Sequence, residues 1–143
     1  MENQDFSTTV VVKQSPAEVF KTLLNVRAWW SGLYDESFEG SSDQVGDEFS
    51  FRAGGGAHYS KQKLVELVSG KQVKWLVTEA NLNFVDITDE WKGTTIEFDL
   101  AEKDGGTEIT FTHHGLVPQF ECYDDCAPAW QLYVHQQLVN ALQ

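Results

Sequence analysis

The sequence predicts an α+β domain in which a curved antiparallel sheet of about six or seven strands wraps around a long C-terminal helix. Three observations predict it. Segments that alternate with period two fill most of the chain, helical periodicity occurs only near the two ends, and glycine-rich turns separate the strands. Most strands have one apolar and one polar face, which is typical of a sheet with one face in water. The long helix is the only element large enough to cover the other face.

Composition and charge limit the classes of protein that this chain can represent. It has 143 residues, of which 41% are hydrophobic, and a formal net charge of −12. The length predicts a single domain over residues 1–143, and 5 Trp, 9 Phe and 4 Tyr supply a core. No apolar run approaches the ~18 residues of a membrane span, and the start MENQDFS does not resemble a signal peptide. We therefore expect a cytoplasmic protein without membrane insertion, and the acidic charge argues against nucleic-acid binding.

The N-terminal part is expected to hold one strand and two short helices. Alternation predicts the strand over residues 6–12. Residues 15–18, Ser-Pro-Ala-Glu, combine an N-cap serine, a proline at the first helical position and a glutamate three residues after the cap. A second short helical piece is predicted over residues 26–31, before Gly32.

The middle of the chain reads as a series of strands. They are predicted around residues 49–51, 58–68, 73–77, 84–87, 96–100 and 109–113, of which 84–87 has the weakest pattern. Glycines at 54–56 allow a turn, and Asp-Gly-Gly at 104–106 is a strong hairpin signal.

The longest helical segment is predicted over residues 125–142. Its apolar residues recur at steps of three and four, namely Ala127, Trp130, Val134, Leu138 and Ala141. Pro128 is expected in the first turn, where its missing N–H does little harm.

Several segments resemble the START-like helix-grip superfamily (SRPBCC). They are SPAEVF at 15–20, Trp29-Trp30, GDEFSF at 46–51 and TEITFTH at 107–113. Within the superfamily the chain is similar to bacterial proteins related to the C-terminal domain of the activator of Hsp90 ATPase, and HHGLVP at 113–118, ECY at 121–123 and Trp130 resemble a bacterial subgroup. The resemblance covers essentially the whole chain. It implies a helix-grip fold with a cavity between sheet and C-terminal helix, but no single activity, because the superfamily includes lipid carriers, hormone receptors, polyketide cyclases and co-chaperone domains.

The candidate ligand-binding residues are mostly aromatic side chains expected on the inner surface of the grip. They are Trp30, Phe49, Phe51, Trp75, Phe98, Phe111, His113, Trp130 and Val134. A concave surface lined by aromatic rings suits an apolar or aromatic ligand. The alternative is a fully packed core without usable space, and the sequence leaves both readings open.

Trp29 and Trp30 are adjacent, and adjacent helical residues point about 100° apart. We therefore expect the two rings not to share one contact surface. Either one ring lies at the mouth of a pocket, or one belongs to the core and the other packs on the surface.

His113 is predicted to point inward with Phe111, whereas His114 points outward. An inward imidazole can orient a ligand or act as an acid or base, or it can simply be hydrogen-bonded to a neighbour.

No cofactor, metal site or catalytic residue is predicted. Cys122 and Cys126 are expected to be reduced thiols, and together with the two adjacent histidines they lack the spacing of a zinc site. The glycines at 54–56 are not followed by the Lys-Ser/Thr of a phosphate loop, and no nucleophile with its base is apparent.

Three functions are compatible with these features of the sequence. The leading hypothesis is a non-enzymatic domain that binds a small, largely apolar or aromatic molecule. The alternatives are a co-chaperone or protein-interaction module similar to the Hsp90 activator, whose partner would be a chaperone or another protein, and a cyclase- or dehydratase-type enzyme that uses His113. A cavity of at least ~300 Å³ with a few polar groups favours binding or catalysis, whereas a filled core favours the interaction module.

Overall fold

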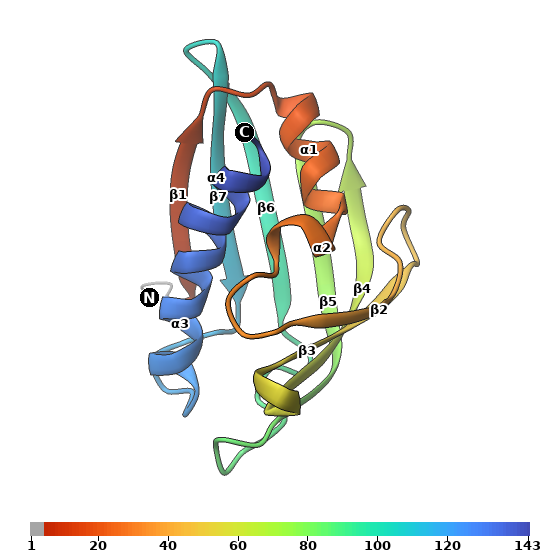
Figure 1. Cartoon of the computed structure of the whole chain (residues 1–143), viewed down its shortest axis with the longest axis vertical. Coiled ribbons are helices and arrows are strands. Elements are labelled where there is room, and N and C mark those ends of the chain that lie inside the picture. Colours follow the sequence, from red (N-terminus) through yellow and green to blue (C-terminus); the bar gives the residue numbers. More distant parts are fainter. Residues whose placement is uncertain (1–4) are drawn as a thin grey trace.

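A computed structural model describes residues 5–143 and contains the predicted curved antiparallel sheet. Its seven strands pair in the order β1-β7-β6-β5-β4-β3-β2 (Figure 1). The strands are β1 (Phe6–Val12), β2 (Ser37–Gly40), β3 (Glu48–Ala53), β4 (His58–Val68), β5 (Gln72–Leu82), β6 (Thr95–Lys103) and β7 (Gly106–His114). Every pair of neighbouring strands is antiparallel, as the hairpin signals predict.

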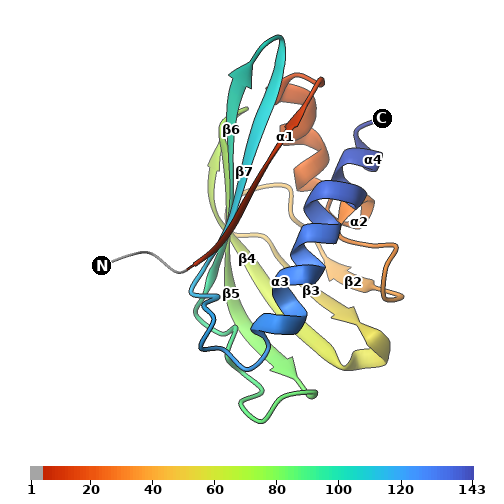
Figure 2. The ribbon, with the colours of Figure 1, turned by 90° about the vertical axis from the view of Figure 1, so that its left-hand side faces the viewer.

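The helices all lie on the concave side of the sheet (Figure 2). Two short helices follow the first strand, α1 (Pro16–Leu24) and α2 (Val26–Trp29), and a short 3₁₀ turn, η1 (Gly54–Gly56), joins β3 to β4. The C-terminal helix consists of α3 (Tyr123–Leu132), a π-helical segment η2 (Tyr133–Leu138) and α4 (Val139–Ala141). Among residues 5–143, no helix is long and apolar enough to cross a bilayer.

The start of α1 has the predicted cap. The Ser15 hydroxyl accepts a hydrogen bond from the Glu18 backbone N–H at 3.3 Å and lies 3.3 Å from the Glu18 carboxylate. The first of these contacts satisfies one of the backbone donors that the first helical turn leaves without a partner. The start of α3 differs from the prediction, because the helix begins at Tyr123 rather than at residue 125. Pro128 is therefore inside the helix, beyond its first turn.

Two strand assignments need correction. Residues 84–87 do not form a strand but belong to the loop between β5 and β6, where the Ile87 side chain is exposed. The structure also contains a strand that was not predicted, β2. It is a short edge strand in which no residue is buried, so it lacks the alternation that marks a half-buried strand. At its end, Gly40 has φ +101°, and a Cβ there would collide with the Glu48 carbonyl oxygen. Only glycine permits this close approach.

Aromatic rings connect the inner face of the sheet to the C-terminal helix. The ring of Trp75 contacts Phe98 edge to face at a centroid distance of 6.2 Å, and Phe98 contacts Phe111 at 5.0 Å. Phe111 then meets Trp130 of α3 at 4.5 Å. The six aromatic residues predicted for this interior are each at most 2% exposed: Phe49, Phe51, Trp75, Phe98, Phe111 and Trp130. Their predicted burial is confirmed.

Candidate functional site

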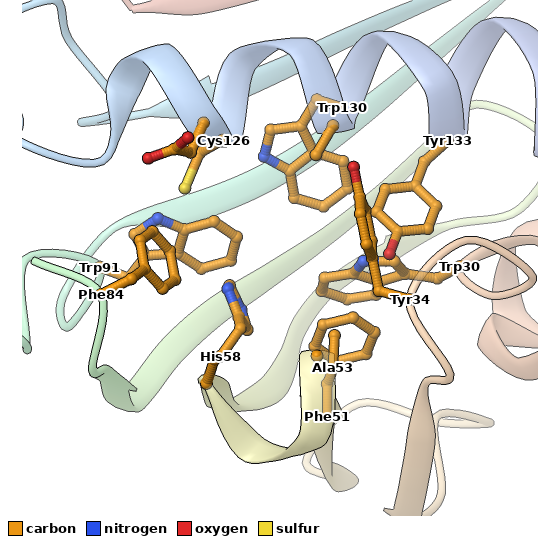
Figure 3. Close-up of a pocket in the computed structure, with 14 residues that line it drawn as sticks. Trp30, Tyr34, Phe51, Ala53, His58, Phe84, Trp91, Cys126, Trp130 and Tyr133 are labelled. Carbon is orange, nitrogen blue, oxygen red and sulfur yellow. The ribbon is translucent and has the colours of Figure 1, made fainter.

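An aromatic pocket of about 370 Å³ lies between the C-terminal helix and the end of the sheet formed by β3, η1 and β4 (Figure 3). Seven aromatic side chains line it: Trp30, Tyr34, Phe51, Phe84, Trp91, Trp130 and Tyr133. Small residues leave room between the rings, namely Ala53, Gly54, Ala57 and Ala129. Tyr34 and Phe84 are 45% and 44% exposed, so the pocket opens to solvent beside them. The space between sheet and helix is therefore not completely filled.

The pocket contains some of the predicted site residues and omits others. Trp30, Phe51 and Trp130 line it. The remaining six are buried in the core and do not line it: Phe49, Trp75, Phe98, Phe111, His113 and Val134. Three of them contact rings of the wall: Phe49 meets Trp30, Phe111 meets Trp130, and His113 meets both Trp91 and Trp130.

Sequence reasoning missed several lining residues, most of which lie outside the regular periodic segments. Tyr34 and Trp91 lie in loops, where no periodicity indicates the direction of a side chain, and Phe84 lies in the loop that was wrongly predicted as a strand. The sequence does indicate that Tyr133 points toward the pocket, because it follows Trp130 by three residues on the same helical face. His58 is the first residue of β4 and pairs with Ala53 across the β3–β4 ladder, which places it beside Phe51.

Trp29 and Trp30 share a contact surface, contrary to the prediction. Their rings stack with centroids 5.7 Å apart and an interplanar angle of 12°, and both are buried. Trp30 is the C-cap of α2 with φ −90° and ψ 49°, so the helical spacing of about 100° does not apply to it. Trp29 fills the core and donates its indole N–H to the Leu23 carbonyl at 3.0 Å. Trp30 stacks on Phe51 at 4.4 Å and forms part of the pocket wall.

His113 is fully buried behind the pocket, and both of its ring nitrogens have partners. The Trp130 indole N–H donates to Nδ1 at 3.1 Å, so Nε2 carries the hydrogen and donates to the Thr94 hydroxyl at 2.8 Å. The Thr94 hydroxyl donates in turn to the Trp91 carbonyl at 2.6 Å. The inward direction predicted for His113 is confirmed, and of the roles left open for it the structure shows the hydrogen-bonded one, whereas His114 is partly exposed.

The electrostatic state of His113 follows from its burial. Loss of hydration, with smaller contributions from the nearby His58 and His114, lowers its pKa to about 3. The imidazole is therefore neutral near pH 7. It fixes the Trp130 ring and, through Thr94, the loop that carries Trp91.

Three polar groups line the pocket beside the rings: His58, Asp125 and Cys126. His58 makes edge-to-face contacts with Phe51 at 5.2 Å and with Trp91 at 4.6 Å. Its Nε2 lies 3.3 Å from the Ser60 hydroxyl. Burial lowers the pKa of His58 to about 4, so this ring is also neutral near pH 7.

Glu36 fastens the loop after α2 to the C-terminal helix. The Tyr133 hydroxyl donates to its carboxylate at 2.5 Å, and the backbone N–H of Gly32 donates at 2.9 Å. Leu33 and Tyr34 add two further backbone donors. Partial burial acts to raise the pKa of Glu36, but these hydrogen bonds outweigh it and lower the pKa. For Tyr133, burial and the adjacent carboxylate both raise the pKa, so the phenol keeps its proton.

The loop between β5 and β6 is attached to the start of α3 by two glutamates. The Glu90 carboxylate accepts hydrogen bonds from the backbone N–H groups of Glu121 at 3.0 Å and Cys122 at 3.3 Å. The Glu121 carboxylate accepts one from the Ile87 backbone N–H at 2.8 Å. These bonds hold the loop that carries Phe84 and Trp91 against the helix.

Cys122 and Cys126 are buried free thiols at the start of α3. The hydrogen bond between them raises the pKa of Cys126, which lines the pocket, and lowers that of Cys122. The Cys126 thiol therefore stays protonated at the pocket wall. Within residues 5–143, no three or more His, Cys, Asp or Glu side chains are grouped so that they could hold a metal ion.

A curved antiparallel sheet that grips a C-terminal helix, with an aromatic pocket between them, defines a protein of the helix-grip class. The family model described as "Activator of Hsp90 ATPase homolog 1-like protein" matches residues 13–143. The chain belongs to this family, as the sequence resemblance predicts.

Solved structures confirm the fold. The Aha1 dimer from Colwellia psychrerythraea has 24% sequence identity and a TM-score of 0.74, with 96% of this chain and 95% of that chain covered. A protein from Chromobacterium violaceum has 17% identity and a TM-score of 0.73, with 99% and 98% covered. A protein from Arthrobacter aurescens has 13% identity and a TM-score of 0.76, with 98% and 86% covered. Among curated proteins, no match to the sequence is found.

Proposed function

We propose that this protein binds a small, largely apolar or aromatic molecule in the pocket, without catalysing a reaction. The observation that carries the proposal is the pocket of about 370 Å³ with seven aromatic side chains in its wall. Its size falls in the range of sites for small organic ligands, in which a few polar groups fix orientation among apolar surfaces. His58, Asp125 and Cys126 are such groups.

The wall of the pocket supports binding rather than catalysis. His58 contacts the Ser60 hydroxyl, but Ser60 is fully buried and does not line the pocket, so this pair does not present a nucleophile to a ligand. The Cys126 thiol, with its raised pKa, is a weak nucleophile near pH 7.

The enzyme alternative depended on His113 as an acid or base. Both ring nitrogens are engaged, with Trp130 and with Thr94, and the side chain lies behind the wall. A general base must reach the proton that it removes. His113 instead supports this wall.

An interaction module similar to the Hsp90 activator is the second candidate, and membership of the family favours it. Such a module would act through its surface. Apolar side chains are exposed near the pocket mouth at Tyr34 and Phe84, and Ile87 is exposed on the same loop as Phe84. A partner bound there would shield these three residues from solvent, whereas the exposure of the buried rings would not change.

A thermal-shift screen of lipids, flavonoids and aromatic metabolites tests the first candidate. A ligand present at about 100 times its dissociation constant adds about 2.7 kcal/mol to the free energy of unfolding, which raises the melting temperature by several degrees. Because Trp30, Trp91 and Trp130 line the pocket, a true ligand should also change tryptophan fluorescence. No hit in a broad library, combined with co-purification of an Hsp90-type chaperone, favours the second candidate.

A further inference from the structure

We propose that the ligand of this pocket carries a positively charged nitrogen, as a protonated amine or a quaternary ammonium group, on its apolar or aromatic body. This inference rests on the proposed function and specifies the class of ligand. It follows from the charges of the lining residues, from the rings of the wall and from the partner of Tyr133.

The formal charge that lines the pocket is negative. Asp125, an exposed residue in the first turn of α3, contributes a carboxylate, and His58 is neutral near pH 7 because burial lowers its pKa to about 4. Among the residues that the structure describes, no Lys or Arg lines the pocket. An anionic head group would lose hydration here without gaining a positive partner, whereas a cation gains the carboxylate.

The aromatic wall adds a second attraction for a cation. The face of an aromatic ring carries partial negative charge, and tryptophan is the strongest partner in cation–π contacts. Three of the five tryptophans of the chain, Trp30, Trp91 and Trp130, line this single pocket. Figure 3 shows these rings on different sides of the space, together with Phe51 and the two tyrosines. A cage of this composition suits an alkylated or aromatic ammonium group.

Tyr133 strengthens this preference because its hydroxyl donates to the Glu36 carboxylate at 2.5 Å. A phenol that donates to a carboxylate gains electron density in its ring and its oxygen. Its oxygen retains a lone pair that can accept a hydrogen bond from an ammonium group. Its own proton is committed to Glu36, so Tyr133 is a poor donor for a carboxylate ligand.

Matched ligand series test the inference by isothermal titration calorimetry on the full chain. One series is phenethylamine, phenethyl alcohol and phenylacetate, and the second is tryptamine, tryptophol and indoleacetate. Within a series the apolar body is the same and the head group is cationic, neutral or anionic. We expect each amine to bind roughly 5- to 30-fold more tightly than its alcohol, and each carboxylate to bind most weakly.

Two neighbouring aspartates provide a matched pair of variants. Asp125 lines the pocket, whereas Asp124 lines a groove on another side of α3 beside Phe6, so both substitutions remove one negative charge but only one of them changes the pocket. We expect Asp125→Asn to weaken amine binding roughly 3- to 5-fold and to leave alcohol binding unchanged. Asp124→Asn should change neither.

The outcomes separate the two proposals. Alcohols that bind as tightly as the amines, or carboxylates that bind more tightly, overturn the cationic preference and leave the pocket as a binding site. Equal losses of amine affinity in the two aspartate variants also overturn it, because they assign the preference to net charge alone. If no compound of either series binds, both the inference and the proposed function fail.

Discussion

Trp130 and His113 are joined by a hydrogen bond of 3.1 Å, in which the indole N–H of the C-terminal helix donates to Nδ1 of a histidine on β7. This contact joins the helix to the sheet at the pocket wall. Because Nε2 of the same ring donates to Thr94, one neutral imidazole orients both the Trp130 ring and the loop of Trp91. The shape of the pocket depends on this buried polar contact as well as on apolar packing.

Truncation of Trp130 should be strongly destabilising. The side chain is 1% exposed, so Trp130→Ala removes a buried ring, leaves a cavity and deprives His113 of its donor. We expect the free energy of unfolding to fall by about 3–5 kcal/mol in urea titration. Leu132→Ala on the same helix is the control. Because Leu132 is exposed, this change should lower the free energy of unfolding by less than ~1 kcal/mol. Equal losses in the two variants would show that Trp130 is not part of the core.

His113 should make the protein less stable as the pH falls. Its pKa is about 3 in the folded chain, against ~6.5 when unfolded, so below pH ~6.5 the unfolded chain binds a proton that the folded chain does not. The stabilisation is complete above that pH and is lost progressively toward pH 3. We expect protonation of His113 to contribute roughly 1 kcal/mol per pH unit to the slope of unfolding free energy against pH, between about pH 6 and pH 4.

The variant His113→Asn should remove this contribution from the slope of unfolding free energy against pH. His135→Asn, which removes an exposed histidine of η2, is the matched control for loss of a histidine outside the core. An NMR titration of the wild-type imidazole with a midpoint near ~6.5 would contradict the buried neutral state.

Tyr133 and Glu36 should be energetically coupled. Their hydrogen bond is charge-assisted and fastens the loop after α2 to η2. In a double-mutant cycle with Tyr133→Phe and Glu36→Gln, we expect a coupling free energy of about 1–2 kcal/mol. Chemical denaturation of the four proteins measures it. Additive losses would show that the two side chains act independently.

Gly32 should tolerate a side chain less well than Gly46, a glycine of similar conformation. It has φ +89°, and a Cβ there would collide with Nε2 of Gln137, the group that donates to the Ser31 carbonyl. Gly46 has φ +98° but open space around its Cβ position. Gly32→Ala should therefore displace the Gln137 side chain and cost about 1 kcal/mol, the value of the lost hydrogen bond, beyond the backbone strain that it shares with Gly46→Ala. Equal melting temperatures of the two variants would show that the hydrogen bond of Gln137 contributes nothing to stability.

The sequence predicted the framework of the pocket better than its lining. Strand alternation and helical spacing place Phe51 and Trp130 inside the grip, because the direction of a side chain in a regular element follows from its position. They do not distinguish a ring that lines a space from a ring such as Phe98 that fills the core behind it. That distinction depends on packing in three dimensions, and in particular on the small side chain of Ala129 across the pocket.

The loops account for the rest of what the sequence did not predict. Trp91 enters the wall because Glu90 and Glu121 hold its loop against α3, and these contacts join segments about 30 residues apart. Trp30 leaves helical geometry at the C-cap of α2, which allows the stack with Trp29. Neither arrangement has a periodic signature in the chain.

The most direct test of ligand binding in the pocket is a fluorescence titration of a screening hit against two phenylalanine variants of α3. Ala129 lines the pocket, whereas Gln131 lines the groove beside Phe6, so Ala129→Phe fills the pocket and Gln131→Phe adds the same ring elsewhere on the helix. We expect Ala129→Phe to weaken binding at least about tenfold, equivalent to about 1.4 kcal/mol, while Gln131→Phe binds like the wild type. Unchanged affinity in a folded Ala129→Phe protein would contradict the account.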